Sequence, residues 1–278
     1  MLLFLRRFAR HVSGTVGAAI LLLVILAAVF APHLTRYDPS RPDYGAALQE
    51  PSAAHPFGTD DLGRDYMTRV IYGARTSLNA GLISVGLALL IGLPFGLISG
   101  YFRGFWDEII IMRIVDALQA FPFLILALAI AAVLGPGLNK AMIAIGISFS
   151  PGFIRIVRGQ VLAQREQDHV LAARAQGASD WRIIFQHVLP NSMGPVLVQA
   201  SLAIAGAIIA EASLSYLGLG AQPPTPSWGQ ALTAAQSYLT LHPYLAIWPG
   251  GAIFVTVLAF NLLGDGLRDT TDPRLRGR

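Results

Sequence analysis

Apolar stretches of about 20 residues recur along this chain, and they restrict its fold more than any other feature. An α-helix rises 1.5 Å per residue, so a stretch of this length crosses a hydrocarbon layer of about 30 Å. Only 13% of the residues are charged, whereas about 25% is usual in soluble domains. The sequence therefore predicts an all-α polytopic membrane protein of about six spans, at 14–31, 78–100, 109–134, 138–156, 194–216 and 244–263.

The first apolar stretch follows a basic start that contains Arg6, Arg7 and Arg10. This order also fits a cleavable signal peptide, whose apolar centre has about 7–15 residues. The stretch 14–31 is longer than that, and Pro32-His33 is a poor cleavage site. We therefore expect a retained first span with its basic end inside.

Basic residues set the expected orientation, because Lys and Arg are enriched in cytoplasmic segments. Most of the 20 Lys and Arg residues lie before residue 14, in 102–108, in 155–187 and in the tail. The segment 32–77 opposes this trend with five arginines. The balance predicts cytoplasmic termini and a cytoplasmic segment between the fourth and fifth spans.

That segment, 160–190, is polar but has the pattern of a helical hairpin. No Pro or Gly occurs from 160 to 176, and Gly177 then suits a left-handed helix end. Ser179 is a candidate N-cap with Asp180 behind it, and Pro190 is expected to end the second helix. One apolar stripe is predicted on that helix, formed by Trp181, Ile184, Phe185 and Val188. The hairpin could dock a partner, pack on its own protein or lie in the lipid interface.

The hairpin resembles the "EAA" loop of ABC-importer permeases through Ala172-Ala173, Gly177 and Leu189-Pro190. In that family the loop is the cytoplasmic element that couples the permease to its ATPase subunit. One departure is Leu171, which stands where the family has the Glu that names the motif, so docking here must depend more on shape and apolar contact. The resemblance assigns coupling to Ala172, Ala173, Gly177, Ala178, Ser179, Asp180, Trp181, Phe185, Leu189 and Pro190.

The polar segment 55–78 carries a second pattern. Its composition predicts a loop followed by a short amphipathic helix, with Asp60, Asp61 and Asp65 in turns or caps. A cation site on these carboxylates is the weaker alternative, because Arg64 lies among them. The sequence of this segment also resembles the external loop of the C-type permease subunit of dipeptide, oligopeptide and nickel importers. The motif residues are Phe57, Gly58, Thr59, Asp60, Gly63, Arg64 and Asp65.

Together the two resemblances cover nearly the whole chain and imply a type I importer fold, with five core spans (MetI-like) and one extra N-terminal span. They divide the chain into a first span at 1–34, an external loop at 35–76, a core at 77–270 with a coupling loop at 159–192, and a tail at 271–278. They imply a bacterial inner-membrane location, a homologous B-type permease partner, two ATPases that carry ATP and Mg, and an external substrate-binding protein.

Several single residues invite a functional or a structural interpretation. Arg113 and Asp116 are spaced to pair on one helix face, and Pro122 is expected to bend that helix. Glu211 could face the pathway, although a partnered carboxylate near the outer end is favoured. Trp228 suits the membrane interface.

Catalysis by this chain is not expected. Its one lysine, Lys140, lies outside any phosphate-binding loop, cysteine is absent, and the 6 histidines form no metal-binding pair. No cofactor or nucleic-acid site is predicted.

An ion-coupled carrier and a non-transporting scaffold remain alternatives, but no internal repeat supports the former. Peptides are the expected substrates, with nickel or another small solute as the alternative.

Overall fold

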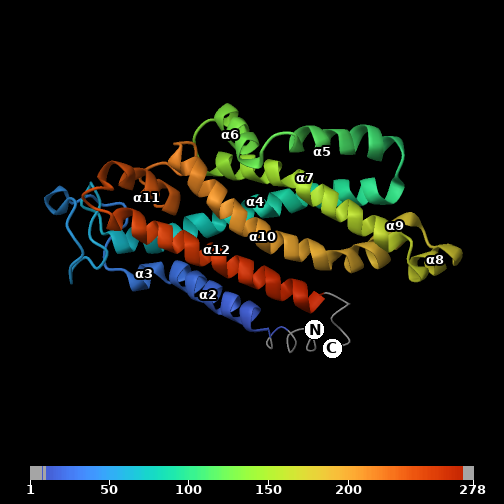
Figure 1. Ribbon diagram of the computed structural model, residues 1–278, viewed down its shortest axis with the longest axis horizontal. Helices are drawn as coiled ribbons and strands as arrows, with labels where there is room; N and C mark the ends of the chain where they lie inside the picture. Colours follow the sequence, from blue (N-terminus) through green and yellow to red (C-terminus); the bar gives the residue numbers. More distant parts are fainter. Residues whose placement is uncertain (1–7, 9–10, 272–278) are drawn as a thin grey trace.

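The computed structural model describes residue 8 and residues 11–271, and the long helices in this part run side by side along one axis (Figure 1). Arg6, Arg7 and Arg10, which form the basic end expected before the first span, lie outside the described residues, as does the tail 272–278. Within the described residues, five helices are long and apolar enough to cross a membrane, or six if one sharply bent pair counts as a span. The long helices are α2 (Val12–Val29), α4 (Tyr66–Phe102), α7 (Leu138–Arg165), α10 (Leu189–Tyr216) and α12 (Tyr244–Thr271).

Short elements gather at the two ends of the bundle (Figure 1). We call one end the loop end: it holds residues 35–65 with α3 (Ala31–Leu34) and η1 (Tyr44–Ala46), and α11 (Trp228–Ala235) with η4 (Gln236–Tyr238). We call the other the hairpin end: it holds α8 (Asp168–Ala175), α9 (Asp180–Ile183) and the π-helical turn η3 (Ile184–Val188).

Helix α4 runs through the bundle from one end to the other. It begins at Tyr66, where Asp65 caps it, so the short amphipathic helix expected before residue 77 is the first part of this 37-residue helix. Three glycines spaced four apart let α7 approach closely, since a Cβ on each would lie 2.5–2.7 Å from a side-chain carbon of α7. The facing pairs are Gly92 with Phe153, Gly96 with Val157, and Gly100 with Val161.

The predicted third span, 109–134, is a broken helix. The π-helical turn η2 (Trp106–Ile111) leads into α5 (Met112–Gln119), and α6 (Phe123–Leu134) follows at an angle of 96°. Pro122 caps α6, so the expected bend at this proline is present and much sharper than a kink. In Figure 1, α6 stands across the direction of α5 and α7.

Two predicted helix boundaries near the hairpin are wrong. The chain turns at 166–167 between α7 and α8, so 160–176 is not one helix. Pro190 does not end the second hairpin helix, because α9, η3 and α10 run together as one helical stretch, Asp180–Tyr216. Pro190 lies in the first turn of α10, just after η3, where the wider π-helical hydrogen-bond pattern accommodates a residue without an N–H group.

The extra N-terminal helix α2 packs on α12. A Cβ on Gly17 would lie 2.7 Å from the Ala259 carbonyl oxygen, and a Cβ on Gly14 would lie 3.0 Å from the Gly266 Cα atom. Small residues therefore bring the two backbones together. The remaining faces of α2 expose apolar side chains such as Leu22 and Leu23.

Candidate functional site

The turn of the hairpin has the predicted left-handed glycine. Gly177 has φ of +79°, and its N–H donates to the Arg174 carbonyl (3.0 Å) while the Ala178 N–H donates to the Ala173 carbonyl (3.1 Å). These two bonds form a Schellman motif, which ends α8. A Cβ on Gly177 would meet nothing within 4 Å, so the glycine is required by its backbone conformation and its surface is open. Ser179 occupies the N-cap position of α9 but makes no side-chain cap bond.

The predicted apolar stripe of the second helix divides into two faces. Ile184 and Val188 are buried with Ile183 in the core. Trp181 and Phe185 point outward, with 59% and 56% of each residue exposed, and their rings stack 6.0 Å apart. Two large aromatic residues thus form an exposed apolar pair, which we call the aromatic pair.

The surface around the aromatic pair is also apolar or small. Phe102, at the end of α4, packs edge-on against Trp181 with ring centroids 6.1 Å apart, and it is itself 45% exposed. On α8, Leu171 and Ala172 are exposed, so the position of the family's Glu carries an apolar side chain at the surface. Ala173, Ala178 and Leu189 instead pack partly against the core, and Pro190 is exposed beside them.

A tyrosine at the end of α4 anchors the hairpin to the bundle. The Tyr101 hydroxyl lies 2.7 Å from Asp180 Oδ1, to which it donates, and accepts a bond from Arg174 Nη2 at 3.3 Å. Arg165 Nη1 donates to the Tyr101 carbonyl at 2.9 Å. The hairpin is therefore bonded to α4, and α4 is bonded at the same residue to α7. Tyr101 was not predicted, because in the sequence it is an ordinary residue at the end of a span.

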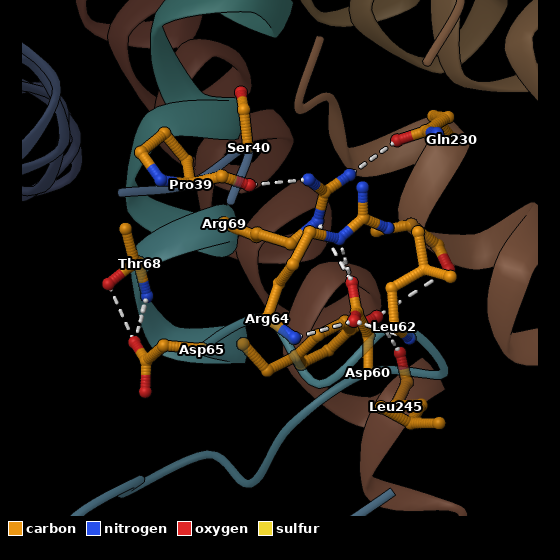
Figure 2. A network of polar contacts seen from close by, with 12 residues as sticks. Pro39, Ser40, Asp60, Leu62, Arg64, Asp65, Thr68, Arg69, Gln230 and Leu245 are labelled. Atoms are coloured by element: carbon orange, nitrogen blue, oxygen red, sulfur yellow. Dashed lines mark hydrogen bonds and ion pairs between the residues drawn. The ribbon is translucent and has the colours of Figure 1, made fainter. Parts of the chain in front are cut away.

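At the loop end, the predicted motif residues form a buried polar network (Figure 2). Asp60 Oδ2 accepts from Arg64 Nε at 2.7 Å and lies 3.3 Å from Arg69 Nε. Arg69 also donates to the Pro39 carbonyl and to Gln230 Oε1. At most 5% of Asp60, Arg64 or Arg69 is exposed. The network joins the loop, α4 and α11.

The other motif residues also fix this loop. Asp65 caps α4 by accepting from the Thr68 N–H at 2.8 Å, and its other carboxylate oxygen lies 2.8 Å from His55 Nδ1. Phe57 stacks on the ring of Trp248, with centroids 3.8 Å apart. Thr59 is buried, and its hydroxyl donates to the Ala46 carbonyl. The glycines Gly58 and Gly63 have φ of +77° and +74°.

These contacts decide between the two interpretations of the aspartates. The Asp60 and Asp65 carboxylates accept bonds from arginine and backbone groups within the chain, so they act in a turn and a cap. No cluster of three metal-ligating side chains occurs in the described part of the chain. A hollow of about 670 Å³ opens beside them and is lined in part by Arg36, Asp38 and Arg41.

The structure bears on three single-residue interpretations: Glu211 is the partnered carboxylate that was favoured, whereas the interpretations of Trp228 and Asp116 are corrected. Glu211 is fully buried and accepts from the hydroxyls of Ser215 (2.7 Å) and Ser77 (3.2 Å), so it does not face a pathway on this chain. Trp228 is a core residue: it is 2% exposed, and its Nε1 donates to the Val70 carbonyl.

Asp116 does not pair with Arg113 as predicted. Its partner is Arg155 on α7, at 2.7 Å. Another pair absent from the sequence analysis joins buried Asp107 to Arg158 at 2.7 Å.

Comparison with known proteins gives the same fold from independent evidence. The structure resembles that of the methionine ABC transporter MetNI in an inward-facing conformation, with a TM-score of 0.62 and 20% identity. The match covers 74% of this chain and 97% of that one. At this identity the likeness shows the fold, which is the MetI-like permease core predicted from the sequence.

Sequence relatives cover almost the whole chain. It is 48% identical over 271 residues to the dipeptide transport system permease protein of Alkalihalophilus pseudofirmus, covering 98% of this chain and 89% of that protein. It is 47% identical over 275 residues to the glutathione transport system permease protein of Pectobacterium atrosepticum, covering 98% and 91%. Two family models also match: the N-terminal transmembrane domain of oligopeptide transport permease C over residues 1–51, and the inner membrane component of binding-protein-dependent transport systems over residues 92–277. The chain therefore belongs to the inner-membrane permease components of binding-protein-dependent (ABC) transport systems, with the N-terminal segment of the oligopeptide permease C type.

Proposed function

We propose that this chain is the translocation subunit of an ATP-driven peptide importer and that its hairpin is the docking element for a cytoplasmic ATPase. The observation that carries the proposal is the exposed aromatic pair, Trp181 and Phe185, on a hairpin bonded to α4 through Tyr101. Aromatic residues on an exposed apolar surface are typical of binding hot spots. The open surface at Gly177 adds a place where another backbone can approach closely.

Peptides are the proposed substrates. The two relatives described above are named for a dipeptide and for glutathione, which are both small peptides with charged groups. Relatives at 47–48% identity that cover 98% of the chain make the same substrate class the best-supported one.

The remaining assembly follows from this role. A homologous permease subunit completes the pathway, two ATPases bind ATP and Mg at the hairpin end, and a substrate-binding protein meets the charged loop end. Both termini and the hairpin are then cytoplasmic. When nucleotide closes the ATPases, the hairpin moves α4 and α7 with it. Each tenfold shift between inward-open and outward-open states requires about 1.4 kcal/mol of differential binding.

Co-purification tests the proposal. The chain is co-expressed with its partner permease and ATPases, and the ATPase recovered per permease is measured for the wild type and for the Trp181→Ala/Phe185→Ala double variant. We expect at least a tenfold loss of ATPase in the variant. The control is Leu22→Ala/Leu23→Ala, which removes equally exposed apolar side chains from α2. Equal ATPase recovery in all three proteins would overturn the docking assignment.

A further inference from the structure

The break between α5 and α6 is exposed at the surface of the chain. Ala120, Phe121 and Pro122 form the break, and all three are exposed. Neither helix beside the break is long enough to cross a membrane by itself, but the two together are. Irregular backbone at membrane depth is stable only against protein or a water-filled cavity, because lipid cannot satisfy its polar groups. We therefore expect this face to contact protein or water rather than lipid.

Charged side chains lie on the same face. Asp116 Oδ1 is 2.7 Å from Arg155 Nη2, and the two side chains are 51% and 52% exposed. Arg113 is exposed one turn before Asp116 on α5, and Gln119 follows one turn after it. Charged residues in membrane spans face a protein interior or an aqueous path, since exposure to lipid is costly.

Other surfaces of the molecule show that this arrangement is local. The exposed face of α2 is apolar, with Leu22 and Leu23 as examples, which suits lipid. The acids Asp107 and Glu211 are buried and bonded within the chain. The pair of Asp116 and Arg155 differs from them because both of its side chains are half exposed and the ion pair is open to exchange with another ligand.

We propose that the face formed by α5, the break at 120–122 and α7 around Arg155 lines the translocation pathway, and that the Asp116–Arg155 pair contacts the termini of the solute. The inference rests on the proposed function and adds to it the part of the chain that meets the substrate. A peptide with free termini carries an ammonium and a carboxylate group, so Asp116 would receive the ammonium and Arg155 the carboxylate. Discontinuous helices beside a transport path supply such sites in other membrane carriers.

The chain has no cysteine, so accessibility can be measured with single-cysteine variants. Arg113→Cys and Ala120→Cys place a thiol on the proposed pathway, Leu23→Cys on the apolar face of α2, and Val85→Cys in the core. The complete complex is treated with a charged, water-soluble methanethiosulfonate. We expect positions 113 and 120 to react at least tenfold faster than positions 23 and 85. Rates as slow as those of the two controls would overturn the pathway assignment.

Substrate contact is tested on the same complex. Dialanine at millimolar concentration should slow the labelling of Ala120→Cys severalfold, whereas dialanine with an acetylated amino end and an amidated carboxyl end should not. Asp116→Asn and Arg155→Gln should each remove this protection and lower dialanine uptake at least tenfold, with unchanged ATPase recovery. Protection that is equal for the free and the capped peptide, or that survives both substitutions, would exclude the role of the pair. If wild-type permease recovers no ATPase at all, the proposed function itself fails, which is a distinct outcome.

Discussion

The loop end and the hairpin end both carry a sequence motif, and both are attached to the same helix, α4, yet their chemistry is opposite. At the loop end the conspicuous residues are charged and buried, and Asp60, Arg64 and Arg69 satisfy one another inside the chain. At the hairpin end the conspicuous residues are apolar and exposed, and Trp181 and Phe185 each leave more than half of their surface accessible.

This difference separates two reasons why a motif can exist. A motif whose charged residues are buried and paired with one another is accounted for by the stability of the single chain. An exposed aromatic pair adds little to the stability of the single chain and suits contact with a second molecule or with the lipid interface. The contacts of the loop end therefore form a scaffold that fixes the start of α4, whereas the exposed surface of the hairpin end is the one to which we assign docking.

The largest effect is expected from Asp60→Asn. The substitution leaves two arginines buried without their negative partner, and breaking a buried ion pair in this way costs about 3–5 kcal/mol. The melting temperature of the purified protein in detergent should fall strongly. Asp61→Asn is the matched control, because Asp61 is only partly buried and the ion pairs of this network are made by Asp60 instead. Equal melting temperatures for the two variants would contradict the scaffold role.

Substitution of one tryptophan at each end compares the contributions of the loop end and the hairpin end to stability. Trp228→Ala removes a side chain that is 2% exposed and should destabilise the protein by about 3–5 kcal/mol. Trp181→Ala removes a side chain from a residue that is 59% exposed and should change the melting temperature little, while ATPase recovery falls. The comparison fails if Trp181→Ala lowers stability as much as Trp228→Ala does.

Two glycines with positive φ, Gly177 and Gly63, are expected to show a smaller difference in stability when each is replaced by alanine. Alanine at Gly177 should cost about 1–2 kcal/mol, the penalty of the left-handed conformation alone, because its Cβ meets nothing within 4 Å. Alanine at Gly63 has the same penalty and also places Cβ 1.6 Å from the Asp43 carbonyl oxygen. Thermal melting of both variants should rank Gly63→Ala as the less stable. The reverse order would show that the hairpin turn is packed more tightly than the loop.

The sequence predicted those features that depend on local pattern. Apolar length located the spans, Gly177 marked the hairpin turn, and Pro122 marked the bend, because each depends on residues that are close in sequence. Features that depend on packing between distant segments were missed. The stripe of Trp181 and Ile184 could not be divided into exposed and buried faces without knowing where α4 and α7 lie, and the partner of Asp116 is 39 residues away on another helix.

Motif resemblance also could not distinguish a surface from a scaffold. The spacing of Asp60, Arg64 and Asp65 does not reveal that their charges are paired inside the chain, since Arg69 and Gln230 complete the network from α4 and α11. For the same reason Glu211 was left between two roles, which only its burial beside Ser77 and Ser215 decides in favour of a partnered carboxylate.

The smallest structural change with a distinct functional result is expected at Tyr101. Tyr101→Phe keeps the ring but removes the hydroxyl that bonds Asp180 and Arg174, a loss of about 1 kcal/mol. The hairpin would remain folded but would be held less firmly to α4. We therefore expect normal ATPase recovery together with more ATP hydrolysed per peptide transported, measured in proteoliposomes.

Tyr66→Phe is the matched control at the opposite end of α4. The Tyr66 hydroxyl donates to the Leu245 carbonyl and is buried, so its removal should lower stability by a similar or larger amount. Since Tyr66 belongs to the scaffold, the ratio of ATP to peptide should not change. A rise in that ratio for both variants would mean that coupling depends on the general stability of α4. A rise for Tyr101→Phe alone would assign the transmission of force to the bonds between Tyr101 and the hairpin.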